Sequence, residues 1–138
     1  MIRILAVVAG LMMGLMCVAQ PKFTKENEAR AAEIVAQMTL EEKVYQMFIV
    51  TPEALTGYDV VNASTEITKG WLEKYPVGGL VYFADNIMTR EQTEDMLKNT
   101  TASAMELQGM PMFLCVDEEG GRVVRVAGND KMGVTNVG

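Results

Sequence analysis

The 138-residue sequence contains no histidine and only two cysteines, and these absences exclude several kinds of site. Without histidine, the chain cannot build a Ser–His–Asp triad or a histidine-based zinc centre from its own residues. Cys17 lies in an N-terminal apolar run, and removal of that run would leave Cys115 with no partner for an internal disulfide. Cys115 has apolar neighbours and no basic residue beside it, so we expect a core thiol and not a nucleophile.

Basic residues are also scarce. The chain has 12 lysines and arginines against 18 aspartates and glutamates, a net charge of −6, and no basic cluster. Nucleic-acid binding depends on basic side chains that neutralise phosphates, so this composition argues against it. The 49% of hydrophobic and 22% of charged residues are typical of a packed globular protein. The length suits one domain, whereas a complete (β/α)8 barrel needs roughly 250 residues.

The first 19 residues have the layout of a secretory signal peptide. Arg3 supplies a positive start, residues 4–19 carry no charge, and Ala19 is a small residue before a plausible cleavage point. The apolar run is shorter than the ~20 residues that a membrane-spanning helix prefers. We therefore predict cleavage after Ala19, a secreted or cell-envelope protein without a stable membrane span, and a domain over residues 20–138. Lipid attachment at Cys17 and an uncleaved membrane anchor are the alternatives.

Two helices are predicted in the first third of that domain. Residues 24–37 are charged and contain several alanines, which favours a helix. Thr39 and Glu42 then have the spacing of a capping box, in which each side chain accepts from the backbone N–H of the other residue. The second helix would carry an apolar face that needs a large partner. Its members are Leu40, Val44, Met47 and Phe48.

A loop and a short helix are expected next. Residues 51–63 include Pro52, Gly57 and Asn62 and predict a loop. Ser64 or Thr65 could cap a short helix that contains Trp71. Trp71 could stack on a sugar ring, but its helical spacing favours a place in the core.

The middle of the chain predicts a strand–helix–strand unit. Residues 77–83 and 112–116 are apolar runs without polar alternation, typical of strands in a parallel sheet, and we expect the first to be buried on both faces. Between them, Thr89 and Gln92 have capping-box spacing at the start of a helix. Its apolar stripe consists of Met96, Leu97, Thr100, Ala104 and Leu107. Such a βαβ unit has parallel strands.

Ligands of parallel α/β proteins bind at the carboxyl ends of the strands, because loops converge there. Asp117 follows the second predicted strand directly, and Asp85 and Asn86 follow the first. These positions are therefore candidates for the edge of a binding site.

Residues 117–125, with the sequence DEEGGRVVR, combine the groups that bind sugar hydroxyls. Carboxylates accept hydrogen bonds and arginines donate several, while paired glycines let the backbone approach a ligand closely. A solvated acidic turn with local Glu–Arg pairs is the alternative. The segment lacks the pattern of a phosphate loop, and its carboxylates would repel phosphate. Asp117 and Glu119 have no second ligand cluster to support a magnesium site, so we predict neither a metal nor a cofactor.

This segment resembles the DQEGGRVxR signature of glycoside hydrolase family 3, and within it the β-N-acetylhexosaminidase branch. Residues 38–48 resemble a helix of the same family, and residues 77–83 with Asn86 resemble its first barrel strand, in the same order and spacing. The resemblance covers residues 29–125. One departure is Glu118, where the family usually has glutamine, which adds a charge beside the pocket.

The resemblance implies an α/β fold that is the first βαβ portion of a truncated TIM-like (β/α)8 barrel. It also implies hydrolysis, with retention, of terminal β-linked N-acetylhexosamine in an oligosaccharide or glycan. Asp117 and Arg125 would contact the terminal sugar, with Glu119 and Arg122 holding the loop. The family's nucleophile is an aspartate and the acid/base of this branch a histidine, both expected downstream of Gly138.

We therefore expect no catalytic residue in this chain and no activity from the chain alone. A β-glucosidase-like member of the family is an alternative. A non-catalytic secreted carbohydrate-binding module and an unrelated secreted α/β protein of regulatory type are the others.

Overall fold

The computed structural model describes residues 24–119, 121–126, 129 and 132. The chain divides into two compact units, Met1–Gln37 and Met38–Gly138. In the first unit the structure describes helix α2 (Lys25–Gln37), which confirms the helix predicted over residues 24–37. The predicted signal segment, with Cys17 and Ala19, lies outside the described residues. None of the described helices is long and apolar enough to cross a membrane.

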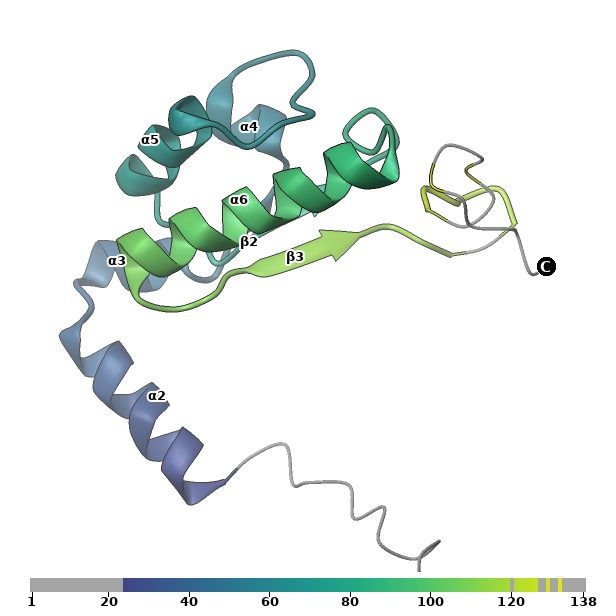
Figure 1. Cartoon of the computed structure of the whole chain (residues 1–138). Coiled ribbons are helices and arrows are strands. Elements are labelled where there is room, and N and C mark those ends of the chain that lie inside the picture. The colour runs from purple at the N-terminus through teal and green to yellow at the C-terminus, as the bar shows by residue number, and fades with distance from the viewer. Residues whose placement is uncertain (1–23, 120, 127–128, 130–131, 133–138) are drawn as a thin grey trace, which may run out of the picture. The chain divides into compact units, whose positions relative to one another are not determined.

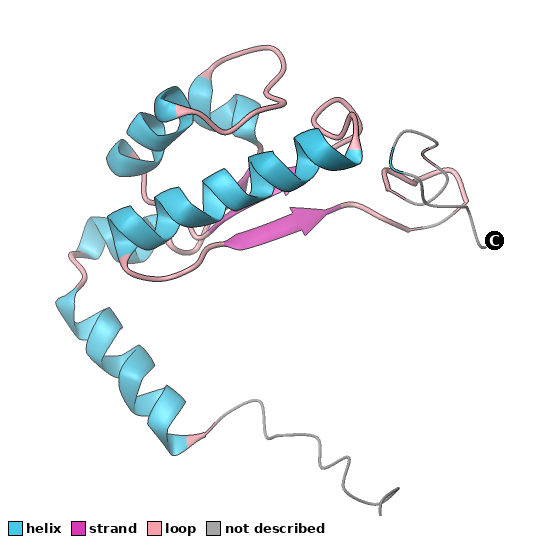
Figure 2. Cartoon of the chain, viewed as in Figure 1, coloured by secondary structure: helices cyan, strands magenta, loops and turns pink. Residues whose placement is uncertain are grey.

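The second unit is built on a three-stranded parallel sheet with the order β1-β2-β3. The strands are β1 (Ile49–Val50), β2 (Gly79–Tyr82) and β3 (Phe113–Val116). Helices α4 (Pro52–Thr56) and α5 (Glu66–Lys74) lie between β1 and β2 in the chain, and α6 (Arg90–Gln108) lies between β2 and β3 (Figures 1 and 2). The structure confirms the predicted α/β class, the two predicted strands and their parallel pairing. Each of these two strands is shorter than the apolar run that predicted it.

Helix α4 corrects the loop predicted over residues 51–63. Thr51 caps α4 by accepting a hydrogen bond from the Ala54 N–H at 3.1 Å, and Pro52 occupies the start of the helix. Gly57 ends α4 in the left-handed conformation, with φ of 77°. Proline at the first helical position and glycine just after the last are ordinary boundary signals, so this sequence did carry the pattern of a very short helix.

The capping box at Thr39 is confirmed at the start of α3 (Leu40–Tyr45). The Thr39 N–H donates to Glu42 Oε2 at 2.7 Å, and the Glu42 N–H donates to Thr39 Oγ1 at 3.2 Å. The bond from the Thr39 N–H, and a second one from the Thr39 hydroxyl at 2.8 Å, lower the pKa of the Glu42 carboxyl, because both favour its charged form.

The prediction that this helix buries an apolar face is wrong. Leu40 is 79% exposed and Met47 is 82% exposed. The physical reason is that α3 ends at Tyr45, so Met47 and Phe48 do not continue its face. Their backbone N–H groups instead donate to Val44 and Tyr45 in a tight turn that leads into β1.

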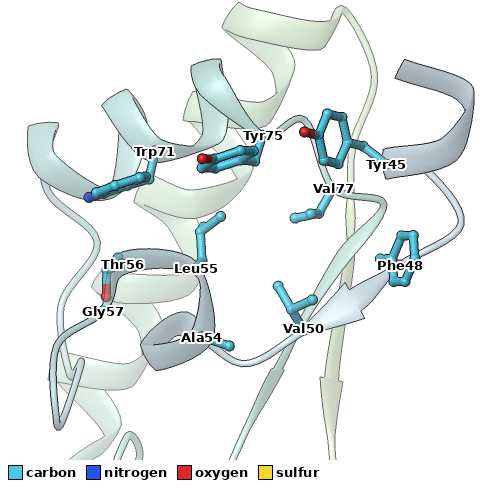
Figure 3. Close-up of a pocket in the computed structure, with 10 residues that line it drawn as sticks. All are labelled: Tyr45, Phe48, Val50, Ala54, Leu55, Thr56, Gly57, Trp71, Tyr75 and Val77. Carbon is cyan, nitrogen blue, oxygen red and sulfur yellow. The ribbon is translucent and has the colours of Figure 1, made fainter. Parts of the chain in front are cut away.

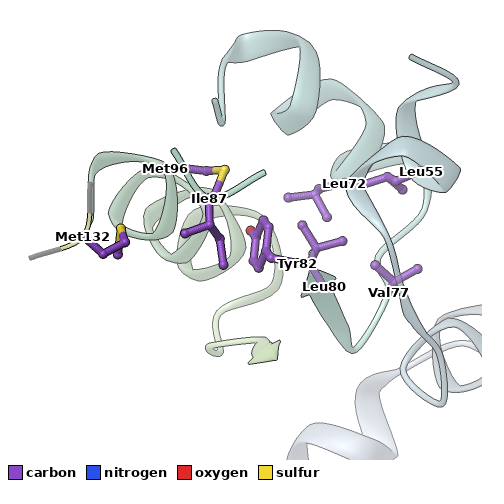
Figure 4. Packing of buried hydrophobic residues seen from close by; sticks show 8 residues of the cluster. All are labelled: Leu55, Leu72, Val77, Leu80, Tyr82, Ile87, Met96 and Met132. Atoms are coloured by element: carbon purple, nitrogen blue, oxygen red, sulfur yellow. The ribbon is translucent and has the colours of Figure 1, made fainter. Parts of the chain in front are cut away.

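The core lies where α4, α5 and α6 pack against β2 (Figure 4). Leu72 of α5 and Leu80 of β2 are almost completely buried, and Met96 of α6 joins them, as the predicted stripe requires. The hydroxyls of Tyr82 and Thr100 share a hydrogen bond of 3.2 Å between β2 and α6. Burial raises the pKa of the Tyr82 hydroxyl, since the charged phenolate would lose its hydration.

Cys115 of β3 is free and partly buried, beside a cavity of about 130 Å³ between β3 and α6. Its neighbours along that cavity include Met96 and Leu114. It is thus a packing residue at the border of the core, as expected of a thiol with apolar neighbours.

Two consecutive glycines allow β2 to approach the elements on either side of it. A Cβ atom on Gly78 would collide with the backbone carbonyl oxygen of Gln46, just after α3. A Cβ atom on Gly79 would lie only 2.7 Å from the carbonyl oxygen of Phe113 in β3. The Gly78 N–H donates to the Tyr45 carbonyl at 3.2 Å, and its own carbonyl accepts from the Phe113 N–H at 2.8 Å. This contact between backbones therefore depends on the absence of side chains.

The substitution Gly78→Ala should lower the free energy of unfolding by about 1–3 kcal/mol, because the new methyl group would push the backbone of Gln46 away. Gly70→Ala is the matched control, since nothing lies within 4 Å of the added Cβ in the middle of α5. That change should raise the free energy of unfolding by about 0.5–1 kcal/mol, as alanine favours helix. Urea unfolding measures both, and a Gly78→Ala protein of unchanged stability would contradict the close approach.

Candidate functional site

The carboxyl ends of β2 and β3 bring the main candidate residues together. Tyr82 lies opposite Val116 in the parallel register, so Phe83 and Asp117 are the next residues on adjacent strands. Arg125 returns to the same place: its Nη2 lies 3.9 Å from Asp117 Oδ2, and its guanidinium carbon lies 5.9 Å from the centre of the Phe83 ring. Asp117 and Arg125, the two predicted sugar contacts, are thus neighbours, although 39% and 23% of their side chains remain exposed.

The Arg125 side chain keeps a hydrogen-bonding capacity that the described residues do not use. Its Nε is buried and has no hydrogen-bond partner among them. A buried donor without an acceptor is unfavourable by about 1–3 kcal/mol. Sequence reasoning missed Phe83, whose half-exposed ring lies against this guanidinium, because the end of an apolar strand gives no signal for such a contact.

The chain between Asp117 and Arg125 is a closed loop. Gly121 adopts a left-handed conformation with φ of 60°, and the Glu119 N–H donates to the Val123 carbonyl at 2.9 Å. One carboxylate oxygen of Glu118 accepts two backbone N–H groups, from Arg125 at 2.7 Å and from Val126 at 2.9 Å. Gly120 lies outside the described residues.

The described side-chain support of this loop therefore comes from Glu118. Loop support was predicted for Glu119 and Arg122, whose side chains are exposed. Neither side chain forms a hydrogen bond or ion pair within the part of the chain that the structure describes. Their roles stay predictions.

Asn86, predicted near the binding edge, is a structural residue in this fold. It is only 2% exposed, and its amide nitrogen donates to Glu53 Oε1 at 2.5 Å and to the Val61 carbonyl at 2.8 Å. Its amide oxygen accepts from the Phe83 N–H at 2.7 Å. Asp85 beside it is exposed. Because the amide of Asn86 is engaged with Glu53, Val61 and Phe83, it serves the loops and not a ligand.

The second predicted capping box, formed by Thr89 and Gln92, is only half present. Thr89 does cap α6, accepting from the Gln92 N–H at 3.2 Å, but the Gln92 side chain does not reach back to Thr89. Its oxygen accepts from the Met88 N–H at 3.0 Å, and its nitrogen donates to the carbonyls of Asn86 and Asn62. The α4–α5 connection is thereby tied to the β2–α6 loop.

A larger pocket of about 500 Å³ lies elsewhere, between α4, α5 and the segment around β1 (Figure 3). Trp71, expected in the core, is partly buried there and stacks on Tyr75 with ring centres 5.8 Å apart. Among the described residues, no carboxylate or arginine belongs to the wall. The lining residues are Tyr45, Phe48, Val50, Ala54, Leu55, Thr56, Gly57, Trp71, Tyr75 and Val77. The side-chain polar groups of this wall are the hydroxyls of Tyr45, Thr56 and Tyr75 and the indole N–H of Trp71, so it lacks the charged groups found in residues 117–125.

No group of three metal-ligating side chains is assembled within the described residues. The candidate site is therefore the carboxyl edge with Asp117, Arg125 and Phe83. It pairs one hydrogen-bond acceptor and one multiple donor beside an aromatic ring, which suits a neutral polyhydroxyl ligand.

Comparison with known families decides the class of protein. Residues 39–132, more than half of the chain, match the model described as the glycosyl hydrolase family 3 N terminal domain. The chain belongs to glycoside hydrolase family 3. The matched range includes the three strands, α6, and the loop that carries Asp117 and Arg125. Family membership predicted from residues 117–125 is thereby confirmed.

Several curated proteins are similar over part of this family 3 chain. A beta-hexosaminidase of Stenotrophomonas maltophilia is 39% identical over 66 residues, which cover 46% of this chain and 18% of that protein. A beta-hexosaminidase of Xanthomonas axonopodis pv. citri is 36% identical over 66 residues, 46% of this chain and 19% of that protein. Beta-hexosaminidase A of Pseudoalteromonas piscicida is 30% identical over 56 residues, which cover 40% of this chain and 9% of that protein. The matched stretch thus spans less than a fifth of each relative, and no solved structure gave a significant match.

The substitution Asn86→Ala should lower the free energy of unfolding by about 2–4 kcal/mol, because the Val61 carbonyl loses a donor, the Phe83 N–H loses its acceptor and Glu53 Oε1 loses one of its two donors. Asp85→Ala, at the exposed neighbouring position, should change it by less than about 0.5 kcal/mol. Thermal and urea unfolding of both variants provide the measurement. Equal stability of the two variants would mean that the Asn86 bonds do not hold the loops.

Proposed function

We propose that the protein to which this chain belongs hydrolyses terminal β-linked N-acetylhexosamine in glycans, and that this chain forms part of the sugar-binding pocket. The observation that carries the proposal is the meeting of Asp117 and Arg125 at the carboxyl edge, within the segment that matches the family model. The names of the curated relatives, all beta-hexosaminidases, support an amino sugar as the substrate class.

Asp117 and Arg125 would divide the contacts to the terminal sugar. The Asp117 carboxylate accepts hydrogen bonds from sugar hydroxyls, and the Arg125 guanidinium donates to hydroxyl or carbonyl oxygens. The net charge of −6 is compatible with a neutral ligand and unfavourable for an anionic one.

The bond-breaking groups belong to another part of the protein in this proposal. Retaining hydrolysis requires a nucleophile and an acid/base on either side of the glycosidic bond. Asp117, Glu118 and Glu119 are consecutive and serve one edge, so they do not supply such a pair. The nucleophile and the acid/base would lie downstream of Gly138, and the chain alone would then bind a sugar without cleaving its bond.

The proposal also includes a setting for this activity. The parallel order β1-β2-β3 with helices between the strands is compatible with one part of a (β/α)8 barrel, which binds ligands at the carboxyl ends of its strands. Residues 1–19 have the layout of a signal peptide with cleavage after Ala19. The substrate would therefore be a glycan outside the cytoplasm or in the cell envelope.

N-acetylglucosamine added to the chain should shift the NMR signals of residues around Asp117 and Arg125. Asp117→Ala and Arg125→Ala should each weaken this binding about tenfold or more, since a hydrogen bond to a charged group contributes about 1.5–3 kcal/mol. Asp85→Ala, which removes an exposed carboxylate, should bind as the original does.

Three results would count against the proposal. Preference for glucose would favour a β-glucosidase-like member, and equal binding by Asp117→Ala would remove this residue from the pocket. Hydrolysis of an aryl β-N-acetylglucosaminide by the purified chain would show that its catalytic groups lie inside it.

A further inference from the structure

Glu118 closes the loop that carries Arg125. Its Oε2 accepts the backbone N–H groups of Arg125 at 2.7 Å and of Val126 at 2.9 Å, from residues seven and eight positions further along the chain. Hydrogen bonds to a carboxylate are stronger than those between neutral groups. The first and last parts of the loop are thus joined at a single oxygen atom.

The residue after Arg125 fixes the other side of the loop. Val126 packs against the hydrophobic core and borders the cavity between β3 and α6. Met132 is buried further on, where its sulfur lies 3.7 Å from the Thr93 hydroxyl of α6. The backbone at Arg125 is therefore held by the hydrogen bonds to Glu118 and by the packing of the next side chain, Val126, against the core.

We propose that Glu118 is a positioning residue, which holds the Arg125 backbone so that the guanidinium lies between Asp117 and the Phe83 ring. The two bonds end on one oxygen, and glutamine also offers one such oxygen. A glutamine at this position would therefore keep both acceptor contacts, in a weaker and uncharged form. The consequence for sugar affinity rests on the proposed function, whereas the loop geometry does not.

The test compares Glu118→Ala with the conservative Glu118→Gln in the full chain. Glu91→Ala, at an exposed position in the first turn of α6, removes the same charge and serves as the control. Amide hydrogen exchange of Arg125 and Val126 reports the two bonds. The NMR signal of the Arg125 Nε–H reports the guanidinium, and amide protection within α6 reports the fold. Titration with N-acetylglucosamine reports affinity.

In Glu118→Ala, exchange at Arg125 and Val126 should accelerate about ten- to a hundredfold, in line with the strength of hydrogen bonds to a charged group. The Arg125 Nε–H signal should shift or broaden, sugar binding should weaken about tenfold, and α6 should keep its protection. Glu118→Gln should restore all three readouts to within about threefold, and Glu91→Ala should change none.

Two outcomes would overturn the inference. One is unchanged exchange and an unchanged Arg125 Nε–H signal in Glu118→Ala. The other is a Glu118→Gln protein that behaves like Glu118→Ala, because the acceptor geometry would then be insufficient. If the original chain binds no N-acetylglucosamine but the exchange pattern follows the expectation, the proposed function fails and the positioning role of Glu118 stands.

Discussion

The parallel pairing of β2 with β3 determines where every candidate residue lies. Because Tyr82 and Val116 are partners in the register, the strands end together, and Phe83 and Asp117 leave the sheet side by side. This pairing requires the bare backbone of Gly79, whose added Cβ would meet Phe113. A shift of one residue would send each side chain to the opposite face. The position of Asp117 beside the Phe83 ring therefore depends on a contact at the other end of the strands.

Two side-chain amides, of the buried Asn86 and the partly buried Gln92, hold the loops at this edge in place of regular structure. Loops carry backbone groups that no helix or strand satisfies, and such groups need partners when they are buried. Asn86 and Gln92 supply these partners to the Phe83 N–H and to the carbonyls of Val61 and Asn62. The β2–α6 loop and the α4–α5 connection are consequently one assembly. The polar residues at the carboxyl edge thus divide into those that support the loops and those available to a ligand.

The sequence allowed the parts of the fold that depend on local pattern to be predicted. The continuous apolar runs identified β2 and β3, and the spacing of Thr39 and Glu42 identified the capping box of α3. The two residues of β1 are too few to show a period, and the exposed Leu40 looks identical in sequence to a core leucine. The role of Asn86 depends on Glu53, 33 positions away, so no local pattern could separate it from the exposed Asp85.

The candidate site shows the same division. The family resemblance of the segment 117–125 predicted that Asp117 and Arg125 contact the same sugar, and the two residues do lie together. Which neighbour supports them could not be predicted, because Glu118 and Glu119 are chemically alike and adjacent. The difference arises from the fold, in which the chain returns after Gly121 and presents two N–H groups to Glu118.

The adjacent carboxylates of Asp117 and Glu118, just after β3, have different partners. Asp117 turns toward Arg125, while Glu118 turns toward the backbone of the returning loop. An arginine held at its backbone loses less conformational freedom when a ligand binds, so more of the interaction energy appears as affinity. A loop with two glycines would otherwise be costly to order. The hydrogen bonds of Glu118 therefore offset part of the entropy that this glycine-containing segment loses when it is ordered.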